Sequence, residues 1–148
     1  MIMYLDTGIL VKLLTPETES PFFERELVGH TVVSSELALV EVKSALFAKE
    51  RAGIITAAQR AKAETKFAAM VADGFFRLIN FDSHTLRKSV QVIQACHPKV
   101  PLRALDALHV AACDLAQEFP LCTTDARMHA AAQAMHIPVF PKKLPLTI

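Results

Sequence analysis

The stretch MIMYLDTGILVKLL, residues 1–14, decides the fold class of this chain. Residues 2–6 form an apolar run that ends at Asp6, and a second apolar run begins after a Thr-Gly pair. We predict a buried strand over 2–6, followed by a short helix to about Leu14. A carboxylate at the end of a buried strand is either a helix cap or part of a site. Whether Asp6 is a cap or a site residue depends on whether other acids in the chain are placed in the same way.

The rest of the chain alternates predicted helices with short apolar strands. Further strands are predicted where β-branched, aromatic and other apolar residues gather, at 31–35, 75–81, 121–124 and 138–140. Helices are predicted between them, at about 20–28, 35–52, 56–73, 82–97, 101–118 and 126–135. This alternation predicts a single α/β domain over 1–148, with a short, mostly parallel central sheet flanked by helices. In such sheets, ligands bind beyond the carboxyl ends of the strands.

The composition is that of a folded domain and excludes several classes of protein. Hydrophobic residues make up 52% of the chain, which argues against disorder. No apolar run reaches ~18 residues, so we expect no membrane span, and the N-terminus lacks the pattern of a secretory signal. Three cysteines outside any CxxC pair indicate reduced core residues in a cytoplasmic protein. The net charge of +1 neither requires nor excludes a nucleic-acid partner, so any phosphate-binding surface must be local.

Three acids lie at or just after the ends of predicted strands: Asp6, Asp82 and Asp125. Each could be the N-cap of the helix that follows it. For Asp82 we predict only this capping role, because residues 83–85 continue as an ordinary first helical turn. For Asp6 and Asp125, both a cap and a site residue remain possible.

Two more acids, Glu41 and Asp106, lie inside predicted helices on unexpected faces. At about 100° per residue, Glu41 lies far from the charged stripe of its helix and shares its face with small and apolar residues. Asp106 lies at the boundary of a predicted core face, where a cleft wall would be. The residues of that core face are Leu105, Leu108, Ala112 and Leu115. A buried acid is costly unless it is paired or binds a cation. The alternatives are that Glu41 lies on the surface of a slightly rotated helix and that Asp106 is an ordinary acid of an early helical turn.

Four segments, in this order, resemble the PIN domain, and within it the VapC-type toxin ribonucleases. The segments are YLDTGILVKL, ALVEVKSAL, RALDALHVAA and LCTTDARMHAAA, and the resemblance spans nearly the whole chain. The third is the most specific, because Asp-Ala-Leu-His after an upstream Arg is typical of the family. One departure is Gly8, where the family commonly has Ser or Asn, and this could loosen the surroundings of a bound metal. The resemblance implies a metal-dependent endoribonuclease, usually a homodimer, that a cognate antitoxin holds inactive.

The resemblance also implies a set of site residues. Asp6, Glu41, Asp106 and Asp125 match the acidic metal-binding quartet of the family. Thr123 matches the hydroxyl that accompanies the fourth acid, and we count Thr7, next to Asp6, with it as a supporting residue.

The residue types support this chemistry independently. Four converging carboxylates would repel one another and take up protons if no cation were present. Their oxygen ligands suit Mg²⁺ or Mn²⁺, which can activate a water and neutralise charge on a scissile phosphate of RNA. Lys12, Arg103 and Arg127 lie near the acids in sequence and are candidates for contacts with the RNA backbone. His109 could be a ligand, or a histidine at the edge of the core that forms local hydrogen bonds.

Two other functions compete with this interpretation. A haloacid-dehalogenase-like phosphatase also places an Asp after its first strand, but it needs a second Asp two residues later, where this chain has Gly8. A non-catalytic PIN-like module that binds RNA or a protein partner is the other alternative, although degenerate members typically lose acids that this chain keeps. The apolar-rich helices at 20–28 and 35–73 are the predicted docking surfaces for an antitoxin.

Overall fold

The computed structural model describes all 148 residues and contains a five-stranded sheet whose strand pairs are all parallel. The strands are β1 (Ile2–Leu5), β2 (Thr31–Ser35), β3 (Phe76–Ile79), β4 (Leu121–Cys122) and β5 (Val139–Phe140). The helices are α1 (Thr7–Leu14), α2 (Ser20–Glu26), α3 (Ala38–Arg51), α4 (Ala57–Ala72), α5 (Ser83–Cys96), α6 (Ala104–Ala116) and α7 (Ala126–Ala134). The predicted α/β class and parallel sheet are thus confirmed.

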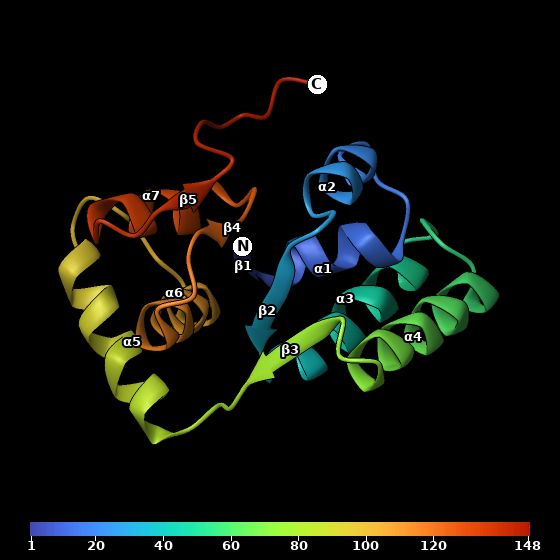
Figure 1. Ribbon diagram of the computed structural model, residues 1–148, viewed down its shortest axis with the longest axis horizontal. Helices are drawn as coiled ribbons and strands as arrows, with labels where there is room; N and C mark the ends of the chain where they lie inside the picture. The colour runs from blue at the N-terminus through green and yellow to red at the C-terminus, as the bar shows by residue number, and fades with distance from the viewer.

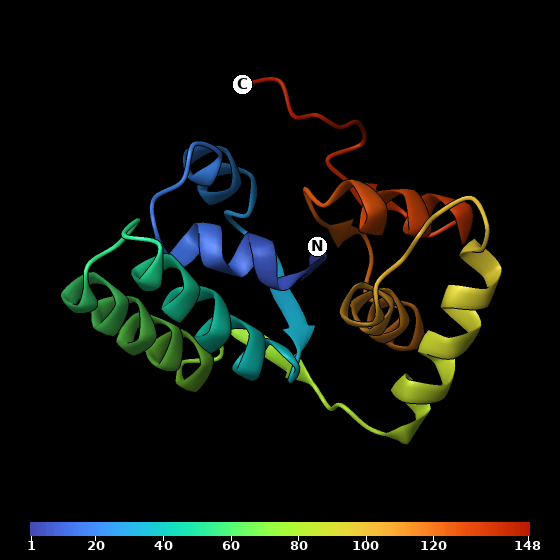
Figure 2. The same ribbon diagram turned by 180° about the vertical axis from the view of Figure 1, so that it is seen from behind.

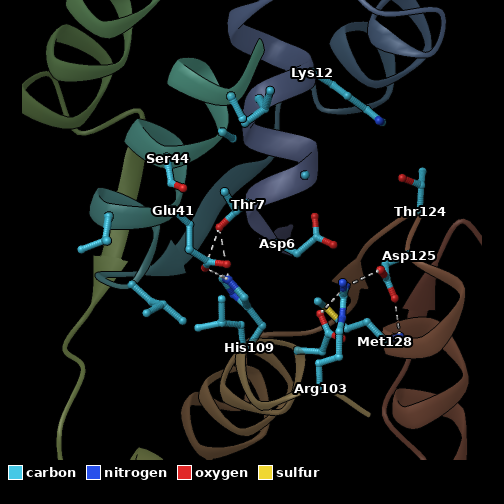
Figure 3. Close-up of a pocket in the computed structure, with 18 of the residues that line it drawn as sticks. Asp6, Thr7, Lys12, Glu41, Ser44, Arg103, His109, Thr124, Asp125 and Met128 are labelled. Carbon is cyan, nitrogen blue, oxygen red and sulfur yellow. Dashed lines mark hydrogen bonds and ion pairs between the residues drawn. The ribbon is translucent and has the colours of Figure 1, made fainter. Parts of the chain in front are cut away.

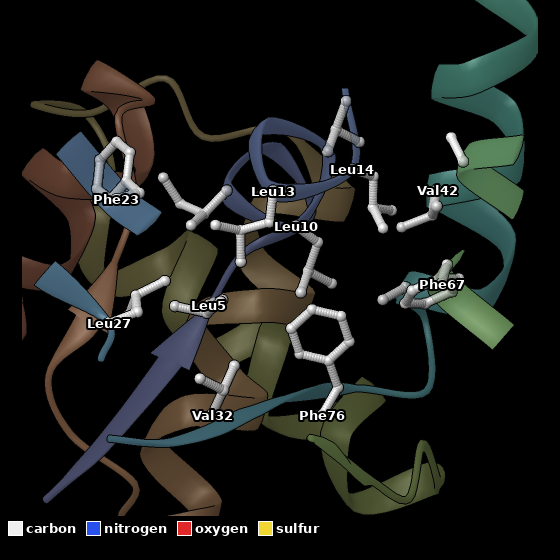
Figure 4. Close-up of a cluster of buried hydrophobic side chains, with 14 of the residues drawn as sticks. Leu5, Leu10, Leu13, Leu14, Phe23, Leu27, Val32, Val42, Phe67 and Phe76 are labelled. Carbon is white, nitrogen blue, oxygen red and sulfur yellow. The ribbon is translucent and has the colours of Figure 1, made fainter. Parts of the chain in front are cut away.

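Helices cover both faces of the sheet, with α1–α4 on one side and α5–α7 on the other (Figures 1 and 2). Alternate residues of one strand enter different cores, since successive side chains of a strand point to opposite faces. Met3 and Leu5 of β1 belong to the core under α1–α4, which Figure 4 shows, whereas Tyr4 belongs to the core under α5–α7. A strand buried on both faces reads as a continuous apolar run, which explains why residues 2–6 lack alternation.

The order of the strands defines where a ligand site is expected. The order across the sheet is β3-β2-β1-β4-β5. Strands β2 and β3 therefore lie on one side of β1, and β4 and β5 lie on the other. The point where the direction reverses lies between β1 and β4. In open parallel sheets the crevice beyond the carboxyl ends of two such strands is the usual ligand site. Asp6 follows β1, and Asp125 lies three residues after β4.

Local hydrogen bonds explain where several helices begin. The carboxylates of Asp6, Asp82 and Asp125 each accept the backbone N–H three residues later, at 2.9, 3.1 and 2.9 Å, and so cap α1, α5 and α7. The predicted capping role of Asp82 is confirmed. At the end of β2, the Ser34 hydroxyl donates to the Leu5 carbonyl at 2.7 Å and ties β2 to β1.

The structure corrects the prediction for the helix at 101–118. The helix begins at Ala104, because the backbone of Arg103 is extended (φ −80°, ψ 159°) and ends the preceding loop. The predicted core face was also wrong for two leucines, since Leu105 and Leu115 are about half exposed (49% and 48%). The buried residues of α6 are Asp106, Ala107, His109, Val110, Ala111, Ala112 and Cys113. Small side chains on this face let α6 pack closely against α5 and the sheet.

Smaller differences concern the ends of elements. Strands β3, β4 and β5 are each shorter than predicted, and α3 begins at Ala38, after a turn in which the Ser35 hydroxyl accepts the Leu37 N–H at 3.1 Å. The three cysteines are free and buried. No helix combines the length and the apolar character needed to cross a membrane.

Candidate active site

A cleft of about 720 Å³ lies at the carboxyl ends of β1 and β4, between the two groups of helices (Figure 3). All four acids predicted as site residues line it, each from a different part of the chain: Asp6, Glu41, Asp106 and Asp125. The other polar residues on its walls are Thr7, Lys12, Glu17, Ser44, Arg103, His109 and Thr124. The structure therefore brings the predicted quartet to one cavity.

Asp6 is the most enclosed of the four acids. It is 4% exposed, and no lysine or arginine forms an ion pair with it. One carboxylate oxygen accepts the Ile9 N–H at 2.9 Å, and the other accepts the Thr123 hydroxyl. Burial raises the pKa of this carboxyl above its usual value, even though both hydrogen bonds act in the opposite direction. Asp6 is therefore both a helix cap and a buried carboxyl group that lacks a cationic partner.

Thr123 connects two of the acids. Its hydroxyl donates to Asp6 and accepts the backbone N–H of Asp125 at 3.0 Å. The Asp125 carboxylate in turn accepts the Met128 N–H at 2.9 Å, and the side chain is about one-third exposed (32%). The supporting hydroxyl thus fixes the position of Asp125 relative to Asp6.

Glu41 of α3 is held by two side chains, Thr7 of α1 on the same side of the cleft and His109 of α6 on the other. Its Oε1 atom accepts the Thr7 hydroxyl at 3.0 Å and lies 2.6 Å from Nε2 of His109. Glu41 lies on the face of α3 that carries Leu37, Ser44, Ala45 and Ala48, and all of these line the cleft. The helical phase of Glu41 in the sequence predicted this placement.

Arg103 binds the remaining two acids. Its Nε and Nη2 atoms lie 2.8 and 3.2 Å from the two oxygens of Asp106, and Nη2 also lies 3.3 Å from Asp125. The interaction with Asp106 is the two-pronged geometry that a guanidinium forms with a carboxylate. Arg103 itself is 62% exposed and faces the mouth of the cleft, so an anionic ligand could reach it.

The other two candidate phosphate-binding cations are placed differently. Lys12 lines the cleft, but its ammonium group forms ion pairs with Glu17 at 3.0 Å and Glu19 at 3.4 Å. The carboxylates of these partners hold the pKa of Lys12 above its usual value despite partial burial. Arg127 is exposed on the surface of α7 and does not line the cleft.

Gly8, the departure from the family pattern, lies at the edge of the cleft. A Cβ atom at this position would lie 3.4 Å from Oδ1 of Asp6, which is an ordinary van der Waals distance. A serine would therefore fit, and its absence leaves room beside the Asp6 carboxylate.

The donor set fits a hard, hydrated cation. The four carboxylates supply oxygen only, and Asp6 is buried without a compensating cation. No three acidic, histidine or cysteine side chains lie close enough together to form a complete set of ligands by themselves. Mg²⁺ commonly binds through one or two carboxylates and keeps several of its waters, so it does not require such a protein cage.

A PIN domain family model matches residues 3–134. This chain belongs to the PIN domain family. The match spans every helix and all strands but β5, so the PIN domain is the fold described above. Family membership also decides against the dehalogenase-like alternative.

Solved structures with the same PIN fold come from several bacteria. VapBC2 from Rickettsia felis, bound to a DNA fragment from its promoter, has a TM-score of 0.67 at 15% identity, over 94% of this chain and 97% of that one. A toxin–antitoxin complex from Klebsiella pneumoniae has a TM-score of 0.64 at 19% identity, over 99% of both chains. VapC20 from Mycobacterium tuberculosis, a toxin that cleaves the sarcin-ricin loop, has a TM-score of 0.67 at 17% identity, over 87% and 94%. No curated protein matches the sequence of this chain.

Three contacts in and beneath this PIN domain's cleft are not predicted by the sequence. The sequence places Tyr4 in a buried strand but does not predict that its hydroxyl lies 2.9 Å from Nδ1 of His109. The bond between His109 and Glu41 joins residues 68 positions apart, so no local spacing could predict it. Arg103 was predicted only as a phosphate contact, although its place three residues before Asp106 on a helix start is a usable signal for an ion pair.

Proposed function

We propose that this PIN domain protein is a divalent-metal-dependent endoribonuclease and the toxin of a VapBC-type toxin–antitoxin pair. One observation carries the proposal: four carboxylates from four separate segments line one cleft at the reversal point of the sheet. Catalytic sites of parallel α/β proteins lie at this place, and a cluster of acids there is suited to a cation and a phosphate rather than to packing.

Asp6, Glu41 and Asp106 would bind the ion and its activated water, and Asp125 would hold a second ion or orient a water. Mg²⁺ or Mn²⁺, when bound, would make a water nucleophilic at neutral pH and offset negative charge on the scissile phosphodiester. The hydrogen bonds from the Ile9 N–H and the Thr123 hydroxyl fix the Asp6 carboxylate before any ligand arrives. Preset ligands of this kind lower the cost of assembling the site.

RNA is the proposed substrate, and Arg103 is the residue proposed to bind a phosphate of its backbone. The guanidinium is exposed at the mouth of the cleft while it is paired with two acids. If a divalent cation neutralises those acids, the side chain becomes available for a phosphate, which guanidinium groups bind in a similar two-pronged geometry. The similar M. tuberculosis toxin, which cleaves the sarcin-ricin loop, makes RNA the first substrate to test.

An antitoxin protein is the proposed partner, as in the similar toxin–antitoxin complex from K. pneumoniae. Helices α3 and α4, part of a predicted docking surface, carry an apolar groove of about 410 Å³ between them. Its walls include Leu39, Leu46 and Val71, and Leu39 is 50% exposed. Exposed apolar surface of this kind supports a protein partner at this place. We also propose a homodimer, which light scattering of the purified protein would test.

Cleavage of an RNA panel by the purified protein tests the proposed activity. We expect cleavage with Mg²⁺ or Mn²⁺, poor cleavage with Ca²⁺ and none in excess EDTA. Asp106→Asn should abolish cleavage, whereas the matched control Asp114→Asn should retain it, because Asp114 lies on the same helix but pairs with Lys88 outside the cleft. Undiminished cleavage in EDTA would contradict metal dependence, and an inactive parent that binds RNA would favour the non-catalytic alternative.

A further inference from the structure

A hydrogen-bond chain runs from buried Tyr4 through buried His109 to Glu41, and its first two members lie outside the acidic quartet. The Tyr4 hydroxyl lies 2.9 Å from Nδ1 of His109, and Nε2 of the same ring lies 2.6 Å from Oε1 of Glu41. Tyr4 is 0% exposed and His109 is 1% exposed. Figure 3 shows the His109 ring pointing from α6 toward Glu41.

We propose that His109, held by Tyr4, is a positioning residue that fixes the Glu41 carboxylate for the ion in the cleft. This inference rests on the proposed metal-dependent function. It assigns to His109 and Tyr4 a role that acts through Glu41, without contact to the substrate.

With Glu41 ionised and the His109 ring neutral, the donors and acceptors of the chain fit one arrangement of protons. An ionised Glu41 only accepts hydrogen bonds, so Nε2 of a neutral His109 must carry the proton that it donates. Nδ1 is then an acceptor, and the Tyr4 hydroxyl is the donor that satisfies it. Tyr4 thereby selects the tautomer that allows His109 to hold Glu41.

The same contacts leave one oxygen of Glu41 available. Both donors, the Thr7 hydroxyl and the His109 ring, reach Oε1, whereas Oε2 forms no hydrogen bond within the protein. The side chain lines the cleft and is 19% exposed. Oε1 is therefore the anchored oxygen, and Oε2 is the oxygen left for an ion or its water.

The arrangement also argues that His109 is not itself a ligand. Both of its ring nitrogens are already engaged within the protein, so neither has a free lone pair directed at the cleft. Tyr4 lies on β1, two residues before Asp6, and so the strand that ends at one acid also fixes a second acid through His109. A rigid link of this kind keeps two ligands from separate segments in register.

A Mn²⁺ titration, read by thermal unfolding in the absence of RNA, tests the inference. We expect His109→Leu to raise the Mn²⁺ concentration at half-maximal stabilisation by about 10- to 100-fold, the usual effect of losing a partner of a metal ligand. Tyr4→Phe removes one hydroxyl at nearly constant volume and should raise this Mn²⁺ concentration by a smaller factor. His109→Gln can still donate to Glu41 and should partly restore the parental value.

His129→Leu is the matched control. His129 is also buried, at 6% exposure, but its Nε2 atom contacts the carbonyl of Pro141, 2.8 Å away, outside the cleft. A purely structural role predicts a lower unfolding temperature in EDTA for both histidine variants and an unchanged Mn²⁺ midpoint. The proposed role predicts a raised midpoint for His109→Leu only, with a matching loss of kcat in RNA cleavage.

The outcomes separate this inference from the proposed function. A parent protein that responds to Mn²⁺, together with His109→Leu at the parental midpoint, overturns the positioning role alone. So does an equal shift in His129→Leu. If His109→Leu does not fold, parental midpoints in both Tyr4→Phe and His109→Gln overturn it. A parent that neither responds to Mn²⁺ nor cleaves RNA overturns the proposed function and this inference with it.

Discussion

Two nitrogens of Arg103 donate hydrogen bonds to the carboxylate of Asp106, at 2.8 and 3.2 Å. Arg103 is the N-cap residue of α6, the helix that carries Asp106 in its first turn. The guanidinium also lies 3.3 Å from Asp125, so one side chain forms ion pairs with two of the four acids. These are the acids that we propose for a divalent cation. In the ion-free protein Arg103 therefore takes the place of a cation and must compete with any ion that enters.

Arg103→Ala should change the response to ions in a characteristic way. We expect a lower unfolding temperature in EDTA, because Asp106 and Asp125 lose their only cationic partner, and half-maximal stabilisation at a lower Mg²⁺ concentration, because the competitor is gone. In the parent, an ion at ten times its dissociation constant should add about 1.4 kcal/mol. Arg77→Ala, which removes an exposed arginine paired with Glu118, is the control and should leave the Mg²⁺ midpoint unchanged. A raised midpoint in Arg103→Ala would mean that Arg103 assists the ion.

The salt dependence of RNA binding should distinguish the three candidate cations. With Ca²⁺ present to limit cleavage, Arg103→Gln should make the slope of log K against log salt concentration less steep by about 0.7, the value of one phosphate contact on a single strand. Lys12→Gln should have a smaller effect, because Glu17 and Glu19 already pair with Lys12. Arg127→Gln should have none, because this residue lies outside the cleft. If the parent and Arg103→Gln showed the same salt dependence, Arg103 would not contact a phosphate of the RNA.

The sequence predicted the elements best where one physical signal dominated. The bounds of β1 and α1 followed from an apolar run interrupted by Asp6, since a strand buried on both faces must be apolar throughout. The predicted start of a helix at residue 101 was wrong, because Pro101 is compatible with a first helical turn but does not require one. The loop continues instead to Arg103, and this places the guanidinium over Asp106.

The predicted core of α6 failed for a different reason. Leucine spacing suggested that Leu105 and Leu115 pack inward, yet the helix buries its small residues and leaves these leucines half exposed. Close packing of helices can favour alanine over leucine at the contact, and no single-helix pattern reports that choice. Position along the elements drew attention to the four acids, and the resemblance to PIN domains assigned them to one site. The partners that hold them could not be predicted, because Glu41 and His109 meet only through the fold.

Growth of bacteria that produce the protein alone tests the toxin assignment. We expect induction to halt growth, and we expect Asp106→Asn to restore it while the protein still accumulates, because the Asn side chain lacks the charge that an ion requires. Immunoblotting measures the accumulation, and Asp114→Asn should remain as toxic as the parent. An Asp106→Asn variant that still arrests growth would show that the toxicity has another source.

Asp6 and Asp82 should show opposite pH dependence, although both cap helices. Burial raises the pKa of Asp6, whereas the hydrogen bonds from Thr85 lower the pKa of Asp82 from its usual value near 3.8. Between 3.8 and its raised pKa, folded Asp6 binds more protons than unfolded Asp6, so its contribution to stability falls as the pH rises through that window. For Asp82 the unfolded state binds more protons just below 3.8, so its contribution is present above that pH and is lost on acidification.

Replacement by asparagine isolates the two effects, because Asn caps a helix about as well as Asp and carries no charge. In EDTA at neutral pH, Asp6→Asn should be at least as stable as the parent, since the cost of a buried charge is removed. Its advantage should shrink as the pH falls through the raised pKa of Asp6 and vanish below about 3.8. Asp82→Asn should instead be slightly less stable than the parent at neutral pH and equal to it at low pH.

Urea unfolding at a series of pH values measures both differences in stability. In a repeat with Mg²⁺, the ion should stabilise Asp82→Asn as it does the parent but should no longer stabilise Asp6→Asn. A clear loss of stability for Asp6→Asn in EDTA, together with an intact Mg²⁺ response, would make Asp6 a cap and nothing more.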